Sequence, residues 1–200
     1  MIAAILLAAG RSQRMGAFKP LLPFGKQTVI EATIDYLRKG GVETIVVVLG
    51  HQAHKLKEHL KHLPVRFALN PDPDSEMTAS ILAGIEKIRG SGATLVALAD
   101  HPAVPPTVVS TLISEWNQGG KLLIPTFQNR GGHPVLIDLR YRTELETLDP
   151  AHGLKALFEA HRGDVKRVPV DSPFIARDMD TWDDYAALHQ EVFGEPPPAK

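Results

Sequence analysis

The stretch that decides the fold is IAAILLAAGRSQRMG at residues 2–16, followed three residues later by Lys19. Its first part, residues 2–7, is an apolar run typical of a buried strand. Its second part is a loop of small residues that carries two arginines. Small side chains let backbone N–H groups approach phosphate oxygens, and the guanidinium and ammonium groups supply the opposing charge. We therefore expect a strand and a loop that bind a nucleoside triphosphate; the alternative is an ordinary strand and turn with solvated arginines.

Composition narrows the classes of function. With 200 residues, of which 44% are hydrophobic and 22% charged, the chain is typical of one soluble globular domain. The net charge of −1 argues against a broad surface for nucleic acid or an anionic membrane, so any anion site must be local. Without cysteine there is no disulfide framework, thiolate nucleophile or Cys-based zinc site. No basic residue precedes the first apolar run as in a signal peptide, and no run is long enough to span a bilayer, so we expect a cytoplasmic protein.

Strand-like and helix-like segments alternate along the chain. The apolar and β-branched runs predict strands at residues 2–7, 43–50, 65–69, 93–99 and 165–170. Helical spacing predicts helices at 28–38, 52–63, 77–88, 107–116, 141–148, 154–160 and 182–192. Residues 122–126 and 134–137 flank a loop and predict a small antiparallel excursion. This order indicates a single α/β domain of three layers over residues 1–194, with a mostly parallel, Rossmann-like sheet, and a flexible Pro-rich tail at 195–200.

Ligands of such sheets bind at the carboxyl ends of the strands, and three polar features fall there. They are the loop at residues 10–19, Asn70 after the third strand, and Asp100 after the fourth. A carboxylate in that position suits Mg²⁺, which prefers one or two carboxylates together with phosphate oxygens. The alternative is that Asp100 caps the next helix, but Pro102 and the Pro105-Pro106 pair delay the start of that helix.

A second acidic cluster, Asp178 and Asp180, lies just before the last predicted helix. Asp180 could simply cap that helix. It could instead meet Asp100 across a cleft, and because neighbouring carboxylates repel, such a pair would need a cation between them.

Other motifs are absent or ambiguous. Neither the Walker A pattern nor G-x-G-x-x-G occurs, which disfavours dinucleotide redox binding. The two glycines before His133 permit a close approach of backbone to ligand, although a tight turn with an exposed histidine fits equally well. Four histidines on one predicted helix read as a solvated face in preference to a metal site: His51, His54, His59 and His62.

Taken together, these motifs resemble the MobA-like nucleotidyltransferases, and most closely the molybdenum cofactor cytidylyltransferase branch. The resemblance runs in order from residue 1 to about 190 and rests on residues 7–16 with Lys19, Asp100-His101-Pro102, Gly132-His133-Pro134 and Asp178-Met179-Asp180-Thr181. It implies a sheet of the nucleotide-diphospho-sugar transferase type and transfer of a nucleotide to a phosphorylated acceptor.

The resemblance also implies roles for single residues. The nucleotide would be bound by Leu7, Ala8, Ala9, Gly10, Arg11, Ser12, Met15, Gly16, Lys19, Asn70 and Ser80. Catalysis would rest on Arg14, Lys19 and Asp100, with Mg²⁺ held by Asp100 and Asp180. The acceptor would face His101, Gly132, His133, Pro134 and Asp178.

Base choice follows from Ala9, because guanylyl-transferring relatives tend to have glycine there and the extra methyl group leaves less room for a purine. We therefore expect Mg²⁺-dependent transfer of CMP from CTP to a phosphorylated acceptor, molybdopterin by resemblance, with release of pyrophosphate and transient docking to a molybdoenzyme. The alternatives are a sugar phosphate or other phosphoalcohol as acceptor, or a nucleotide-binding or cofactor-binding protein without catalysis. His101, Trp182 and Glu76 depart from the usual family residues, mainly on the acceptor side.

Overall fold

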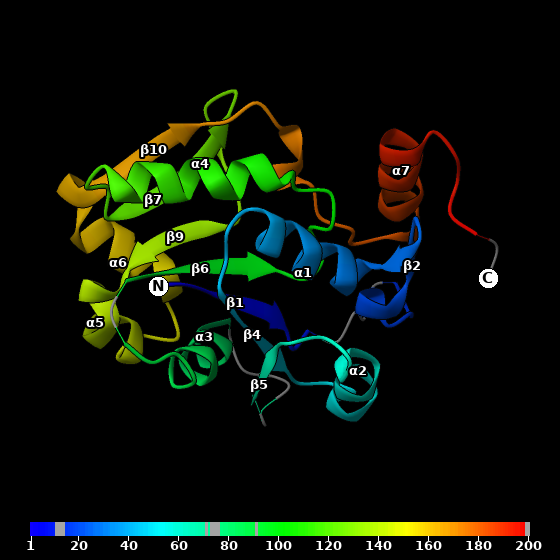
Figure 1. The fold of residues 1–200 in the computed structure, drawn as a ribbon, viewed down its shortest axis with the longest axis horizontal. Coiled ribbons are helices and arrows are strands. Elements are labelled where there is room, and N and C mark those ends of the chain that lie inside the picture. The colour runs from blue at the N-terminus through cyan, green and yellow to red at the C-terminus, as the bar shows by residue number, and fades with distance from the viewer. Residues whose placement is uncertain (11–14, 71, 73–76, 91, 199–200) are drawn as a thin grey trace.

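The computed structural model describes residues 1–10, 15–70, 72, 77–90 and 92–198 (Figure 1). Its central sheet has the strand order β10, β7, β9, β6, β1, β4, β5, and the short β8 pairs with β7. These strands are β1 Ile2–Ala8, β4 Thr44–Leu49, β5 Arg66–Leu69, β6 Ala93–Leu98, β7 Leu122–Phe127, β8 Arg130–Gly131, β9 Val135–Asp138 and β10 Val165–Pro169. Among them only β8 and β9 run antiparallel to their neighbours. The predicted antiparallel excursion is confirmed, because the segments predicted at 122–126 and 134–137 are β7 and β9, which pair antiparallel; β8 lies within the predicted loop.

Helices cover both faces of the sheet (Figure 1). They are α1 Val29–Lys39, α2 Ala53–Leu60, α3 Met77–Ile85, α4 Pro106–Asn117, α5 Arg142–Glu146, α6 Gly153–Ala160 and α7 Trp182–Phe193. The core is accordingly in two parts. Alternate residues of β1 point to opposite faces, so Leu6 packs with α1, α2 and α4, whereas Ile5 packs with α3, α5 and α6. Helix α7 lies apart from the sheet and packs on a third cluster with Phe24 and Val29.

Three local features differ from the sequence prediction. The helix predicted at 77–88 ends at Ile85, since the N–H of Ile88 bonds the carbonyl three residues back in a tighter turn, although Ile88 keeps its buried position. The helix predicted at 141–148 is instead a 3₁₀ turn, η2 Leu139–Tyr141, followed by the short α5. A two-stranded hairpin of β2 Pro23–Phe24 and β3 Gln27–Thr28 was not predicted, because two residues are too few to show alternation.

The helix caps decide two of the alternatives left open by the sequence. Pro105 is the N-cap of α4, so Asp100, five residues earlier, does not cap it. Thr181 is the N-cap of α7 and forms a capping box with Asp184, so Asp180 is not needed as a cap. Both carboxylates are therefore available for another role. Among the described residues, no helix has the length and apolar character needed to cross a membrane.

Helix α3 contacts the sheet closely because residue 84 is glycine. A Cβ atom there would lie 2.5 Å from Cγ2 of Ile5 and 3.2 Å from Cγ2 of Val48, in two adjacent central strands. We predict that Gly84→Ala lowers the free energy of unfolding by about 1–2 kcal/mol, because the overpacking outweighs the better helix propensity of alanine. Urea unfolding measures this directly. Equal or higher stability of the variant would contradict the packing described here.

Candidate active site

The site lies at the carboxyl edge of the parallel strands, where residues far apart in sequence meet. Lys19 begins the 3₁₀ turn η1 Lys19–Leu21 after the glycine loop, and its Nζ donates to Oδ1 of Asp180 at 2.8 Å. The two side chains are 11% and 28% exposed, so the pair is largely removed from water. The predicted basic loop and the predicted second acidic cluster are thus brought together.

Asp100 lies beside the same loop because β6 pairs in parallel with β1. Leu98 stands opposite Leu7, and the N–H of Ala99 donates to the carbonyl of Leu7 at 3.1 Å. Asp100 therefore leaves the sheet next to the point where the loop leaves β1. Its side chain is one-third exposed, which leaves its oxygens accessible to a ligand.

His101 connects the acidic residues. Its Nε2 is 4.0 Å from Oδ1 of Asp100, its ring is buried, and its Nδ1 has no hydrogen-bond partner within the part of the chain that the structure describes. Burial lowers the pKa of His101, while the negative charges of Asp100, Asp178 and Asp180 oppose that shift. All three predicted carboxylates thus act on one buried imidazole.

The donors of this cluster fit a hard divalent cation. Carboxylate oxygens are the ligands that Mg²⁺ prefers, and Asp100 and Asp180, which both act on the charge of His101, could supply them. No group of three or more His, Cys, Asp or Glu side chains among the described residues has the geometry of a metal site. A metal here would therefore take its remaining ligands from phosphate and water, as Mg²⁺ commonly does.

The predicted nucleotide pocket is bounded by the start of the glycine loop and by the end of β5. Of the residues that the structure describes, none would come within 4 Å of a Cβ atom at Gly10. Asn70, directly after β5, is buried, and its Nδ2 donates to Oγ of the buried Ser80 at 2.9 Å. The two predicted pocket residues thus form one hydrogen-bonded pair. Arg11, Ser12 and Arg14 lie outside the described residues.

Met15 and Gly132, two of the predicted site residues, make close contacts with the protein itself. Met15 is buried in the cluster beneath α7, and its carbonyl accepts a hydrogen bond from Nε1 of Trp182 at 2.9 Å, so its side chain anchors the loop. The close approach that Gly132 permits is to protein, because a Cβ atom there would lie 2.2 Å from the carbonyl oxygen of Ile175. The next residue is fixed by the same carbonyl, which accepts from the N–H of His133 at 2.7 Å.

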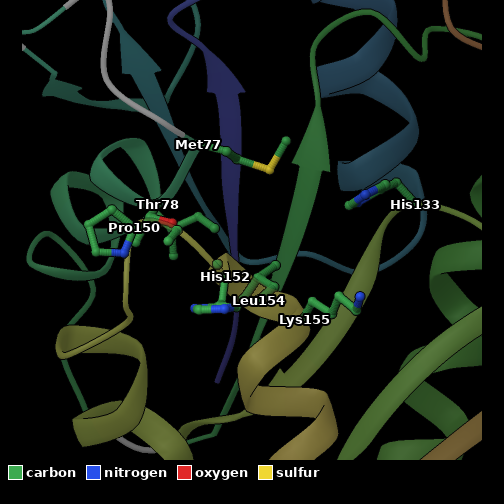
Figure 2. Close-up of a pocket in the computed structure, with 10 residues that line it drawn as sticks. Met77, Thr78, His133, Pro150, His152, Leu154 and Lys155 are labelled. Atoms are coloured by element: carbon green, nitrogen blue, oxygen red, sulfur yellow. The ribbon is translucent and has the colours of Figure 1, made fainter.

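His133 stands between this cluster and an open cavity. Its ring centroid is 6.1 Å from that of His101, and its Nδ1 lies 3.3 Å from the carbonyl oxygen of Val96. The cavity of about 300 Å³ is lined by His133, the first turns of α3 and residues 150–155 (Figure 2). Sequence reasoning missed residues 150–155, because they form a turn and a helix start without any motif.

The predicted histidine face is connected to α1. Nε2 of His59 lies 3.3 Å, and Nε2 of His62 lies 3.7 Å, from Oε1 of Glu31, the capping-box residue of α1. These contacts link α2 and the residues directly after it to α1.

With this geometry in place, comparison with known proteins identifies the family. Residues 4–165 match the model of the MobA-like NTP transferase domain. The chain belongs to the MobA-like NTP transferase family. It shares 32% identity over 149 residues with the nicotine blue oxidoreductase of Paenarthrobacter nicotinovorans, covering 70% of this chain and 72% of that protein. It shares 25% identity over 186 residues with the molybdenum cofactor cytidylyltransferase of Escherichia coli (strain K12), covering 92% and 93%.

The fold is shared with solved structures as well. The crystal structure of a protein from Mycobacterium tuberculosis H37Rv in complex with manganese superposes with a TM-score of 0.81 at 26% identity, covering 96% of this chain and 99% of that chain. The family and the single α/β domain predicted from the sequence are therefore confirmed.

Burial of His133 predicts a pH dependence of stability. Burial is the main cause of its lowered pKa, so the unfolded chain binds a proton more readily than the folded chain. The free energy of unfolding should therefore fall as pH drops below about 6.5, the ordinary histidine value. Urea unfolding at pH 7.5 and pH 5.5 measures the loss, and His133→Asn should reduce it. An unchanged pH dependence in the variant would contradict this account.

Proposed function

We propose that the protein is a divalent-metal-dependent cytidylyltransferase that moves CMP from CTP to a phosphorylated acceptor and releases pyrophosphate. The observation that carries the proposal is the meeting of Lys19 with Asp180, while Asp100 leaves the sheet at the edge where the glycine loop begins and both carboxylates act on the charge of His101. The full-length similarity to a molybdenum cofactor cytidylyltransferase supports molybdopterin as the acceptor, and docking to a molybdoenzyme as the fate of the product. The manganese complex of a structural neighbour supports a divalent metal, for which Mg²⁺ is our choice.

The proposed reaction is an in-line transfer of CMP. An oxygen of the acceptor phosphate attacks the α-phosphorus of CTP in line with the leaving pyrophosphate, so that one P–O bond forms as another breaks. The attacking phosphate is already ionised at neutral pH and needs no strong general base, so positioning and charge neutralisation carry the catalysis. Mg²⁺ held by Asp100 and Asp180 would supply Lewis-acid charge neutralisation to the phosphates. Lys19 and Arg14 neutralise the negative charge that develops on the pyrophosphate.

We assign the choice of nucleotide base to Ala9 and the backbone around it. Its carbonyl oxygen faces the N–H of His51 at 3.4 Å, and its Cβ lies where a Cβ atom on Gly50 would come within 2.7 Å. The methyl group of Ala9 therefore packs against the turn after β4, and it adds bulk at a position where guanylyl-transferring relatives tend to have glycine. This supports CTP in preference to GTP.

Nucleotide specificity is the first test of this function. Mg²⁺-dependent thermal shifts with CTP, GTP, ATP and UTP should show a rise in melting temperature with CTP alone, because ligand binding to the native state stabilises it by mass action. A larger shift with GTP would overturn the cytidylyl assignment. Binding of CTP without pyrophosphate release across a panel of acceptors, including sugar phosphates, would indicate a nucleotide-binding protein without catalysis.

Substitution of the metal ligand and the loop cation tests the mechanism. We predict that Asp100→Asn lowers kcat by about 10³ or more, because a bound metal is worth several kcal/mol of transition-state stabilisation. Lys19→Met should cost about 10²–10³, by analogy with the loss of one transition-state donor. Asp35→Asn is the control, since this carboxylate pairs with Lys39 on the exposed face of α1. Near-normal turnover of Asp100→Asn would refute the metal role.

A redox activity is the second candidate function, because a relative with 32% identity carries an oxidoreductase name. The absence of a G-x-G-x-x-G motif argues against a nicotinamide cofactor bound in the usual way. Oxidation of NADH or NADPH in the presence of a quinonoid dye, without any dependence on CTP or metal, would favour this candidate over nucleotidyl transfer.

A further inference from the structure

The cavity next to His133 has a lining that differs in character from the carboxylate cluster. Its apolar side chains include Met77 and Ile81 of α3 and Leu154 of α6, and its cationic side chain is Lys155 (Figure 2). None of the described residues that line it is an aspartate or a glutamate. Thr78, His133 and His152 supply its other polar side chains, so the cavity suits an anion whose body is largely apolar.

His133 places this cavity beside the reaction centre. The same residue lines the cavity and lies 6.1 Å, ring to ring, from His101, which follows Asp100. A molecule in the cavity would thus have one end near the carboxylate cluster. The nucleotide side of the site, marked by the Asn70–Ser80 pair, involves residues that do not line the cavity.

Lys155 is the cation able to bind an anion at that end. Its side chain extends from α6 toward the side of the cavity on which His133 lies (Figure 2). Its ammonium lies 3.8 Å from Oε1 of Glu159, one turn further along α6, and both side chains are mostly exposed, at 79% and 51%. Exposed i,i+4 pairs contribute only a few tenths of a kcal/mol, so the ammonium can turn to a ligand at little cost.

His152 also lines the cavity, but its side chain is bound to the protein. Nδ1 of His152 is bound to Oδ2 of Asp149 at 2.6 Å, and its imidazole does not extend toward His133 as Lys155 does (Figure 2). This bond holds the turn that precedes α6. After this turn, the first residues of α6, Gly153 and Leu154, line the cavity.

We propose that this cavity binds the acceptor, that Lys155 binds the acceptor's phosphate at the His133 end, and that Met77 and Leu154 select an apolar or aromatic body over a sugar. The proposal rests on the function proposed above and deepens it, because it names the binding site and the chemical class of the acceptor. The phosphate bound by Lys155 is the group whose oxygen attacks the α-phosphorus of CTP, and pyrophosphate leaves.

The test uses phenyl phosphate and glucose 1-phosphate as probes, with binding to the full chain followed by NMR titration. Phenyl phosphate should bind about tenfold more tightly than glucose 1-phosphate. Lys155→Met should weaken phenyl phosphate binding about tenfold or more, the effect of one charge-assisted hydrogen bond. Met77→Ser should lower the ratio of the two affinities while leaving the dependence on Lys155 intact.

The matched control is Glu159→Gln, which removes the same ion pair but leaves the ammonium of Lys155. It should leave phenyl phosphate binding unchanged or slightly tighter, and neither variant should alter the thermal shift given by CTP. Equal affinity for the two probes, or Lys155→Met without effect, would overturn the inference even if CTP binding and pyrophosphate release were normal. Binding of phenyl phosphate that depends on Lys155, in a chain that binds no nucleotide, would sink the proposed function and leave the cavity assignment standing.

Discussion

The pairing of β1 with its two neighbours is the constraint on which the rest of the structure depends. β1 lies between β4 and β6, parallel to both, and Leu7 stands opposite Val48 on one side and Leu98 on the other. Because all three strands end at the same edge, the glycine loop and Asp100 must leave the sheet side by side. A slip of one residue would turn the side chains of β1 to the opposite faces and disrupt both halves of the core.

Charge is concentrated at this edge although the whole chain is nearly neutral. Asp100, Asp178 and Asp180 act on one buried histidine, and Lys19 forms an ion pair with Asp180. A site arranged in this way favours a further cation, and with it a ligand that brings its own negative charge. The cavity beside His133 has a different character, with Lys155 and the apolar side chains of Met77, Ile81 and Leu154 in its lining.

Much of the fold could be predicted because long apolar runs, such as those of β1, β4 and β6, are buried on both faces and tolerate little else. The ends of α3 and α5 and the hairpin at 23–28 could not, since they depend on single turns and on contacts with distant segments. In the site, Lys19, Asp100 and Asp180 were predicted from motifs, and the structure pairs Lys19 with Asp180. The packing role of Gly132 was missed because its close approach to Ile175 is a tertiary property, and residues 150–155 carry no motif at all.

The central claim is that Lys19, Asp100 and Asp180 meet at one metal-bound nucleotide. The most direct measurement is paramagnetic line broadening by Mn²⁺ in the ¹⁵N-labelled protein with CTP, using Mg²⁺ as the diamagnetic reference. The account predicts that the amide signals of Lys19, His101 and Thr181 broaden together and only when both the metal and CTP are present. Broadening confined to one of these segments, or centred on His59 and His62, would contradict it.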